Sequence, residues 1–80
     1  MRIIKRYSKN RRLYDTRRAH HIGYRDVIEL VRQEEPVQII DNASGMDLTA
    51  ETLLAALCGH PGAVTVIGKD NLLAYIRALA

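Results

Sequence analysis

The sequence predicts an α+β fold in one small domain, and three observations lead to it. Short apolar segments separated by turn residues occupy the beginning of the chain, which is typical of strands joined by hairpins. Further along, apolar residues recur three and four positions apart, which is typical of helices. The 80 residues, 48 % of them apolar, suffice for a single core. A domain of this size is only marginally stable alone, so self-association is expected.

A basic strand and a hairpin are expected at the amino terminus. Residues 3–7 form a short apolar and basic segment that is typical of a strand, and the turn-like residues 8–10 follow it. Residues 12–15 and 20–24 bracket the polar residues 16–19, as two strands do in a hairpin with a four-residue loop.

The first helix is expected to begin near Tyr24, where the period of the apolar residues changes. Val27, Leu30 and Val31 fall at helical spacing. Pro36 ends this helix, because proline has no amide hydrogen and disfavours helical geometry in the residue before it.

A second hairpin and a second helix come next. Residues 37–40 are a strand candidate, and residues 41–45 are a strong turn signal in which Gly45 suits the positive-φ position that closes a hairpin. Asp47 or Thr49 is expected to cap the second helix. The leucines of its apolar face are Leu53, Leu54 and Leu57.

The carboxy-terminal part is expected to hold a short strand and a last helix. Residues 59–62 break the second helix, residues 63–67 are β-branched enough for a short strand, and Asp70 or Asn71 caps the last helix. We expect the apolar stripe of this helix to serve as a core or dimer contact. The stripe consists of Leu72, Leu73, Ile76 and Leu79.

The charges of the chain are strongly segregated. The first 18 residues carry eight Lys and Arg side chains against the single acid Asp15, whereas the other 62 carry four cations and eight acids. The cations alternate with Tyr7, Leu13 and Tyr14, which would be wasted in a solvated tail. Such a polarised molecule attracts a polyanion, and a folded basic segment with fixed Arg and Lys is typical of nucleic-acid binding.

Nine residues of this segment are the candidate DNA contacts: Lys5, Arg6, Lys9, Asn10, Arg11, Arg12, Tyr14, Arg17 and Arg18. Arg11 and Arg12 are the best candidates for base or phosphate contacts, because the guanidinium fork fits guanine edges and phosphate oxygens. Adjacent residues of a strand point to opposite faces, so these two have different roles, and pairing of one with Asp15 or a helix acid stays open. The remaining cations are expected to position the DNA backbone without reading its sequence.

Two other residue types have alternative interpretations. Asn10 would read adenine through a bidentate contact or, equally, bond to the backbone of its own turn. Tyr7 and Tyr14 would stack on unpaired bases if the target were single-stranded, but core or interface tyrosines with a wet hydroxyl are favoured.

The sequence contains no pattern typical of catalysis or of a metal site. Cys58 and the histidines at positions 20, 21 and 60 lack zinc-ligand spacing, and Cys58 is expected to be a small buried hydrophobe at the end of a helix face. No glycine-rich phosphate loop or nucleophile elbow is present. We therefore expect a binding protein and not an enzyme, without cofactor or metal.

The sequence also favours a cytoplasmic protein. A lone cysteine fits a reducing compartment. No signal-peptide run is found at the amino terminus, and no segment approaches the ~20 apolar residues of a membrane helix, so a membrane partner is not expected.

Several segments resemble, in order and spacing, the N-terminal DNA-binding domain of bacterial polyhydroxyalkanoate (PHB/PHA) accumulation regulators. These segments are Ile4–Tyr7, Asn10–Thr16, Asp26–Arg32, Ile39–Asp41 and Ser44–Thr49. The resemblance covers about residues 3–58, is most specific over residues 10–16, and leaves residues 59–80 as an unmatched strand-helix extension. The chain differs from the family in an extra residue at Ser8-Lys9 and in Gly23, which replaces the usual hydroxyl cap of the first helix.

The resemblance implies a transcriptional repressor of storage-granule genes that leaves DNA in response to polymer. We therefore expect residues 1–80 to form a single domain that binds duplex promoter DNA as a homodimer or larger homo-oligomer. The main alternative is an interaction module that recognises the polymer, a granule protein or another regulator without contacting DNA, which the apolar residues 72–76 favour. An RNA-binding protein would use the same basic segment.

Overall fold

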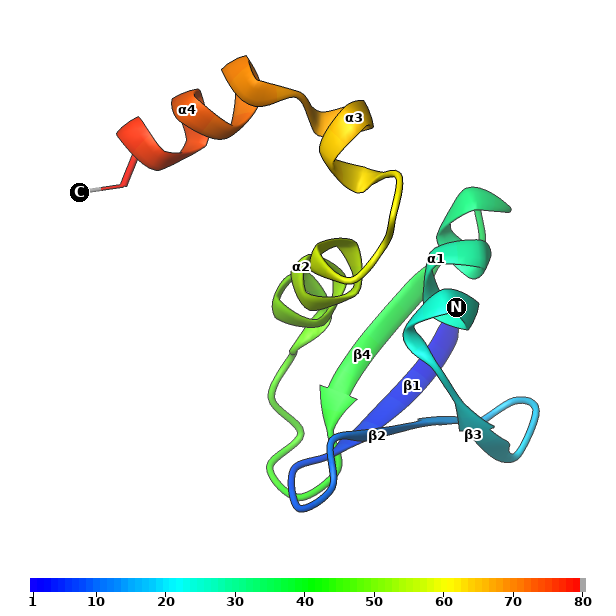
Figure 1. Ribbon diagram of the computed structural model, residues 1–80. Helices are drawn as coiled ribbons and strands as arrows, with labels where there is room; N and C mark the ends of the chain where they lie inside the picture. The colour runs from blue at the N-terminus through cyan, green and yellow to red at the C-terminus, as the bar shows by residue number, and fades with distance from the viewer. Residues whose placement is uncertain (80) are drawn as a thin grey trace.

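The computed structural model describes residues 1–79, in which a four-stranded mixed sheet and four helices confirm the α+β class (Figure 1). The strands are β1 (Arg2–Tyr7), β2 (Arg12–Asp15), β3 (His20–Ile22) and β4 (Val37–Asp41). The helices are α1 (Tyr24–Arg32), α2 (Thr49–Cys58), α3 (Ala63–Ile67) and α4 (Lys69–Arg77). Ala80, the last residue of the predicted 59–80 extension, lies outside the described residues. Within the described part, no helix has the length and apolar character needed to span a bilayer.

The strands lie in the order β3-β2-β1-β4. β1 is antiparallel to β2 and parallel to β4, so Ile4 lies opposite Asp15 on one side and opposite Ile39 on the other. β2 is antiparallel to β3. Because parallel strands cannot be joined by a tight turn, the chain between β1 and β4 passes through the β2–β3 hairpin and α1. Because β1 and β4 are parallel, their carboxy ends lie at the same end of the sheet.

The helices α1 and α2 cover one face of the sheet. Successive residues of a strand point to opposite faces, and on the covered face Ile4 and Ile39 are fully buried. They pack with Val27 and Leu30 of α1, and Leu53 of α2 packs against the same cluster. The opposite face, called the open face below, contributes no residue to this cluster. The strand residues on the open face are Ile3, Lys5, Tyr7, Arg12, Tyr14, His21, Gln38 and Ile40.

Both hairpins have four-residue loops that end in a left-handed residue. The predicted loop at 16–19 is confirmed, and Ala19 has a φ of 58°. The loop between β1 and β2 extends one residue beyond the predicted turn, because Tyr7 pairs with Arg12. Its last residue, Arg11, has a φ of 56°. Four-residue loops of this kind need a residue of positive φ, and neither position is occupied by glycine.

The first helix is confirmed, and each end has a specific closure. At the amino end the N–H of Gly23 donates to Oδ2 of Asp26 over 2.9 Å, so the acid of the first turn closes back on the N-cap residue, while no side chain caps the first amides of the helix. At the carboxy end Glu34 has a φ of 59°, and the N–H of Glu35 donates to the Leu30 carbonyl over 3.0 Å. This is the hydrogen-bond pattern with which helices end in a left-handed residue, and it stops α1 before Pro36.

The predicted second hairpin is reduced to its turn and a short antiparallel return, in which the N–H of Asp41 donates to the Met46 carbonyl over 2.8 Å. β4 forms, but the segment after its turn contributes only one bridge, between Ile40 and Asp47. The Asp41 carboxylate accepts the N–H of Ser44 over 2.7 Å and thereby tightens the turn, and Gly45 takes the predicted positive φ of 75°. The chain then enters α2 directly, which leaves no length for a return strand.

Neither Asp47 nor Thr49 is the cap residue of α2, because the N-cap position belongs to Leu48. The Asp47 side chain accepts the N–H of Thr49 over 2.8 Å, just before the helix. The Thr49 hydroxyl accepts the N–H of Ile39 over 2.8 Å and so connects α2 to β4.

The predicted short strand at residues 63–67 is also wrong, since these residues form the helix α3. β-Branched composition favours a strand only where a neighbouring strand can pair with it, and no described strand does so here. Asp70 and Asn71 are not caps of α4 either. The N-cap position is Gly68, with a φ of 80°, and both polar residues lie in the first turn.

Several side chains predicted to be buried are exposed. α2 buries Thr52 and Ala56, and a rotation of about 100° per residue puts Leu54 and Cys58 on the far side of the helix. Leu54 is accordingly 63 % exposed, and Cys58 is exposed and not a buried hydrophobe. α4 buries none of its residues, so its stripe is not part of this chain's core.

Candidate nucleic-acid interface

The fold divides the cations of the basic segment between the two ends of the β1–β2 hairpin. Residues 8–11 lie at one end, together with the carboxy ends of β1 and β4. Residues 16–19 lie at the other end, beside the start of β1, where the N–H of Thr16 donates to the Ile3 carbonyl over 3.2 Å. The two ends differ in how their charges are balanced.

At the second end, a buried carboxylate collects the arginines. Asp15 is 0 % exposed, and its Oδ2 lies 2.7 Å from Nη1 of Arg2 and 3.7 Å from Nε of Arg18. Its Oδ1 accepts the N–H groups of Arg17, over 2.9 Å, and of Arg18, over 3.3 Å. Burial raises the pKa of this carboxyl, but the Arg18 amide, the Arg2 guanidinium and the Arg17 amide outweigh that effect and hold the pKa below its ordinary value.

Glu35 adds a second carboxylate to this group. Its Oε1 lies 3.0 Å from Nη1 of Arg17 and 3.6 Å from Nε of Arg2. Arg2, Arg17, Arg18, Asp15 and Glu35 are called the paired end below. Arg17 and Arg18 were candidate DNA contacts, and here both guanidinium groups have carboxylate neighbours in their own chain. Their role as DNA contacts stays a prediction, and these pairs count against it.

At the first end, the cations have no such partners. No ion pair within residues 1–79 involves Lys5, Lys9, Arg11 or Arg12. These four residues are called the cationic surface below. Lys9 and Arg11 are exposed in the turn, Arg12 is exposed at the start of β2, and Lys5 is half-buried on the open face. The charge of this surface is therefore available to a partner molecule.

Arg6 lies apart from the cationic surface, on the covered face of the sheet. Its Nη1 donates to Oγ1 of Thr52 over 3.3 Å, which links β1 to α2. Hydrogen bonds from Ser44 lower the pKa of Asp41, and the nearby charge of Arg6 lowers it further. Arg6, a candidate DNA contact, thus links β1 to α2, and its contact with DNA stays a prediction.

The structure assigns different roles to the residues of the turn. Oδ1 of Asn10 accepts the N–H of Arg12 over 3.0 Å, which supports the local interpretation of Asn10 as a turn residue. Neither Arg11 nor Arg12 pairs with an acid within residues 1–79, and Arg2 takes the place beside Asp15. Arg12 lies on the open face with Lys5, while Arg11 stands in the loop itself.

Aromatic rings adjoin the cations on the open face. Tyr14 lies edge-on to His21 with ring centroids 5.4 Å apart, and Tyr7 lies edge-on to the same ring at 6.3 Å. Both tyrosines are half-buried and stand outside the core cluster. This excludes the core interpretation, while an interface role and stacking on unpaired bases both stay predictions, with Lys5 and Arg12 on the same face.

Three shallow hollows flank the turn. One is lined by Arg11 and Arg12 together with Gly23 and Tyr24, so it brings the start of α1 beside the arginines. Another is lined by residues 7–10 with Asn42 and Ala43. The third is lined by Ser8 and Arg11 together with Arg6, Leu48 and the acids Asp41 and Glu51.

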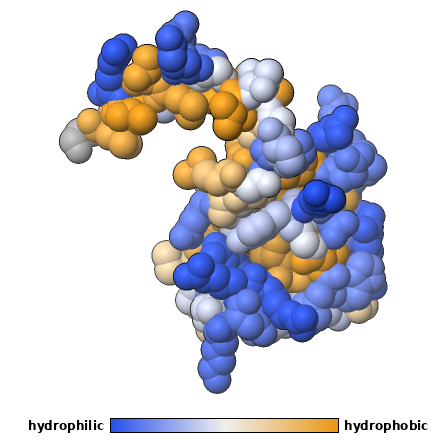
Figure 2. All heavy atoms as spheres, viewed as in Figure 1, coloured by the Kyte–Doolittle hydropathy of each residue, from blue (hydrophilic) through white to orange (hydrophobic). Residues whose placement is uncertain are grey.

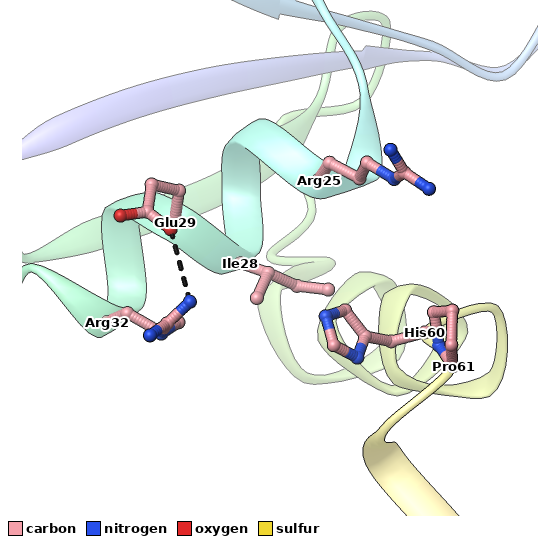
Figure 3. A pocket seen from close by; sticks show the side chains of 6 residues that line it. All are labelled: Arg25, Ile28, Glu29, Arg32, His60 and Pro61. Carbon is pink, nitrogen blue, oxygen red and sulfur yellow. Dashed lines mark hydrogen bonds and ion pairs between the residues drawn. The ribbon is translucent and has the colours of Figure 1, made fainter.

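A further hollow lies between α1 and the segment after α2, and it has no convergent charge (Figure 3). Arg32 on its wall pairs with Glu29 over 3.5 Å, and Arg25 points away from Arg32. His60 also lines it, but within residues 1–79 no group of three His, Cys, Asp or Glu side chains is placed to hold a metal ion.

Comparison with known proteins gives a consistent result. The family model of the PHB/PHA accumulation regulator DNA-binding domain matches residues 3–60. An uncharacterized protein of Allochromatium vinosum is 37 % identical over 75 residues, which are 94 % of this chain and 48 % of that protein. The "Uncharacterized protein in phbA 5'region" of Thiocystis violacea is 43 % identical over 75 residues, which are 94 % of this chain and 54 % of that protein. The chain thus spans about half the length of these curated relatives. No solved structure matches it.

The family match confirms the resemblance found in the sequence, and it covers well over half of the chain. It includes the sheet from residue 3 on, the hairpin with its cationic surface, and the helices α1 and α2. The chain therefore belongs to the family of PHB/PHA accumulation regulator DNA-binding domains.

Proposed function

We propose that this domain represses storage-polymer genes by binding duplex promoter DNA through the cationic surface and covering the promoter. One observation carries the proposal: the cations around the β1–β2 turn have no carboxylate partner within residues 1–79, whereas those of the paired end do. Membership in a family of DNA-binding regulator domains supports DNA as the ligand and points to a binding protein, not an enzyme. The printed name of the Thiocystis relative places that protein in the phbA 5′ region, which supports a role near polymer genes.

The chemistry of the cationic surface suits phosphate and base edges. Arg11 and Arg12 each present a planar fork of donors, and Lys5 and Lys9 act as point charges. Each phosphate that such a cation neutralises releases condensed counterions, so affinity falls as salt rises. For four contacts we expect the logarithm of the binding constant to fall with the logarithm of salt at a slope of about 4 per protomer. In this proposal DNA binding takes place in the bacterial cytoplasm, where the chromosome lies.

A paired set of variants tests the site. The double variant Arg11→Ala/Arg12→Ala removes two charges from the cationic surface, and Arg25→Ala/Arg32→Ala removes two charges from α1. We expect the first to weaken binding to promoter DNA by about 10- to 100-fold and to lower the salt slope by about 2, with the melting temperature nearly unchanged. The second is expected to bind like the parent. Equal effects of both variants would show that only net charge matters and would refute the site.

The alternative functions make different predictions in the same assay. An interaction module that does not contact DNA would give no gel shift at low or at high salt. An RNA-binding protein would lose its duplex DNA when an RNA competitor is added at equal concentration. We expect a salt-sensitive shift that duplex DNA competes for better than RNA. Recognition of the polymer or of granule proteins, if it belongs to this chain, is expected outside the cationic surface.

A further inference from the structure

The open face of the sheet is covered by no helix within residues 1–79. α1 and α2 pack on the other face, whereas α3 and α4 pack on one another and extend away from the sheet (Figure 1). Figure 2 shows that the carboxy-terminal end of this arm stands clear of the rest of the molecule. Every strand residue on the open face is half-buried or exposed. This face is therefore accessible to a ligand.

Three aromatic rings gather on the open face from three adjacent strands. Tyr7 belongs to β1, Tyr14 to β2 and His21 to β3. The His21 ring is edge-on to both tyrosines, and its Nδ1 lies 3.3 Å from the Leu13 carbonyl oxygen, which holds the imidazole in place. None of the three rings belongs to the core cluster. They form one aromatic cluster that faces outward.

Cations border these rings. Lys5 lies opposite Tyr14, and Arg12 lies opposite Tyr7, in the pairing of β1 with β2. None of the strand residues on the open face is an acid. One row across the sheet runs from an acid at the β4 edge to an aromatic ring at the β3 edge: Asp47, Ile40, Lys5, Tyr14 and His21. The half of the face that carries the rings is thus purely cationic, which is complementary to a polyanion.

The charge and the rings together select the kind of polyanion. A second copy of this chain does not suit the face, because two such faces would bring Lys5 and Arg12 against the same cations without an acid between them. A duplex presents its phosphates but keeps the faces of its bases stacked inside. A single strand offers phosphates and unstacked bases together, and proteins bind it with cations for the former and aromatic rings for the latter. Four-stranded sheets with aromatic side chains on an open face stack bases in this way.

We propose that the open face binds single-stranded DNA and stacks its bases on Tyr7 and Tyr14. The phosphates of the strand lie beside Lys5 and Arg12, which also belong to the cationic surface. A strand that follows these two cations therefore continues from the rings to the β1–β2 turn. Membership in a family of DNA-binding domains favours DNA over RNA as the single strand. This binding mode differs from the proposed duplex contact because it needs unpaired bases.

The parent chain tests the role of the bases without any substitution. The probes are an end-labelled oligo(dT) of about 10 nucleotides and an abasic strand with the same number of phosphates. Fluorescence anisotropy is expected to show that the abasic strand binds at least about tenfold more weakly, because stacking is lost while the phosphates remain. Equal binding of the two strands, or no binding of oligo(dT) at low salt, would overturn the proposal.

Substitution of one ring locates the site. Tyr14→Leu keeps an apolar side chain but removes the ring, and it is expected to weaken oligo(dT) binding about fivefold or more. Tyr14→Phe keeps the ring and should bind within about twofold of the parent. Tyr75→Leu removes a ring from α4 and should have no effect. An effect of Tyr75→Leu as large as that of Tyr14→Leu, or an equal loss in Tyr14→Phe, would refute stacking on the open face.

The fold of the variant is checked in the same series. Thermal melting and far-UV circular dichroism show whether Tyr14→Leu is folded, and Tyr7→Leu replaces it if it is not. The comparison of oligo(dT) with the abasic strand depends on neither variant, so it decides the role of the bases in any case. An oligo(U) of the same length is expected to bind more weakly than oligo(dT). Tighter binding of oligo(U) would assign the face to RNA and would overturn the proposal for DNA.

Duplex DNA separates this inference from the proposed function. Tyr14→Leu keeps every cation, so its salt-dependent gel shift with promoter duplex should equal that of the parent. An equal loss of duplex binding would contradict a role specific to unpaired bases. A parent that shifts the duplex but does not bind oligo(dT) would remove this inference alone. A parent that binds oligo(dT) but shifts no duplex would remove the proposed function alone.

Discussion

The guanidinium group of Arg2 lies 2.7 Å from the carboxylate of Asp15, and both side chains are almost completely buried. The pair connects the first residue of β1 to the last residue of β2, so the two strands are held together at the end opposite the turn. Nε of Arg2 has no hydrogen-bond partner and lies 3.6 Å from Glu35. Arg2, although part of the basic segment, therefore has a structural role.

Removing the buried carboxylate charge should strongly destabilise the fold. Asp15→Asn removes the nearer carboxylate of the buried Arg2 guanidinium and leaves it only Glu35 at 3.6 Å, and breaking one side of a buried pair costs about 3–5 kcal/mol. Urea denaturation measures this loss. Glu35→Gln changes a more exposed pair at the same end and is expected to cost less than about 1 kcal/mol. If the two variants were equally mild, the Arg2–Asp15 pair would not be the main connection at this end.

Stability should fall in acid. The pKa of Asp15 is lower in the folded chain than in the unfolded one, and the pKa values of Asp41 and Asp47 are also lowered, chiefly by hydrogen bonds from Ser44 and Thr49. The stabilisation from these carboxylates is fully present above the unfolded pKa of about 4 and is lost as the pH falls through the folded values. Denaturation midpoints measured from neutral pH down to acid should decrease below this point. The decrease should be shallower in Asp15→Asn, and a parallel decrease in both proteins would contradict this assignment.

The variant Arg11→Gly should distinguish the effect of position 11 on the stability of the fold from its effect on DNA binding. Arg11 has a left-handed backbone, which is unfavourable for a residue with a Cβ atom, so Arg11→Gly is expected to gain up to about 1 kcal/mol or to be neutral. The same variant removes a cation and should weaken DNA binding. Ala19→Gly relieves the equivalent position of the other loop and should leave DNA binding unchanged. Thermal melting and a DNA titration on both variants measure the two effects, and a loss of DNA affinity in Ala19→Gly would point to loop flexibility and not to charge.

The open face can be tested through Lys5. Lys5→Gln removes one charge beside Tyr7 and Tyr14 and is expected to lower the salt slope of DNA binding by about 1, without changing the melting temperature. Lys69→Gln removes an equal charge from α4 and should leave the slope unchanged. An unchanged slope in Lys5→Gln would restrict the contact to residues 8–12.

The sequence correctly predicted those elements whose formation depends on residues close together in the chain. The hairpin with the loop at 16–19, the helix α1 and the positive φ of Gly45 follow from local turn chemistry and from helical spacing, and all three are confirmed. The prediction at residues 63–67 failed because strand formation needs a pairing partner, which local composition does not reveal. The apolar face of α2 was assigned to Leu53, Leu54 and Leu57. Leu53 packs against the core cluster, but Leu54 and Leu57 are exposed, and Thr52 and Ala56 are the buried residues of the helix.

The sequence predicted the candidate site only as a basic segment. The fold shows which cations of this segment have carboxylate neighbours and which do not. Eight cations in the first 18 residues look alike in the sequence. Contacts between residues far apart in the sequence decide which cations have a partner in the folded chain. Arg17 pairs with the Glu35 carboxylate, and Arg6 donates to the Thr52 hydroxyl. No sequence signal distinguished Arg2 from the other arginines, except its position two residues before the buried Ile4, on the same side of a strand.

The central position of β1 has a consequence for synthesis. β1 is synthesised before the other strands. Its hydrogen bonds to β4 form later, because each paired residue of β4 lies 35 positions further along the sequence. The β1–β2 hairpin can close early because its contacts are local, whereas the distant parallel pairing is slow to form. A nascent chain would therefore display its positive residues on an unfinished sheet, which is completed only after β4 has been made.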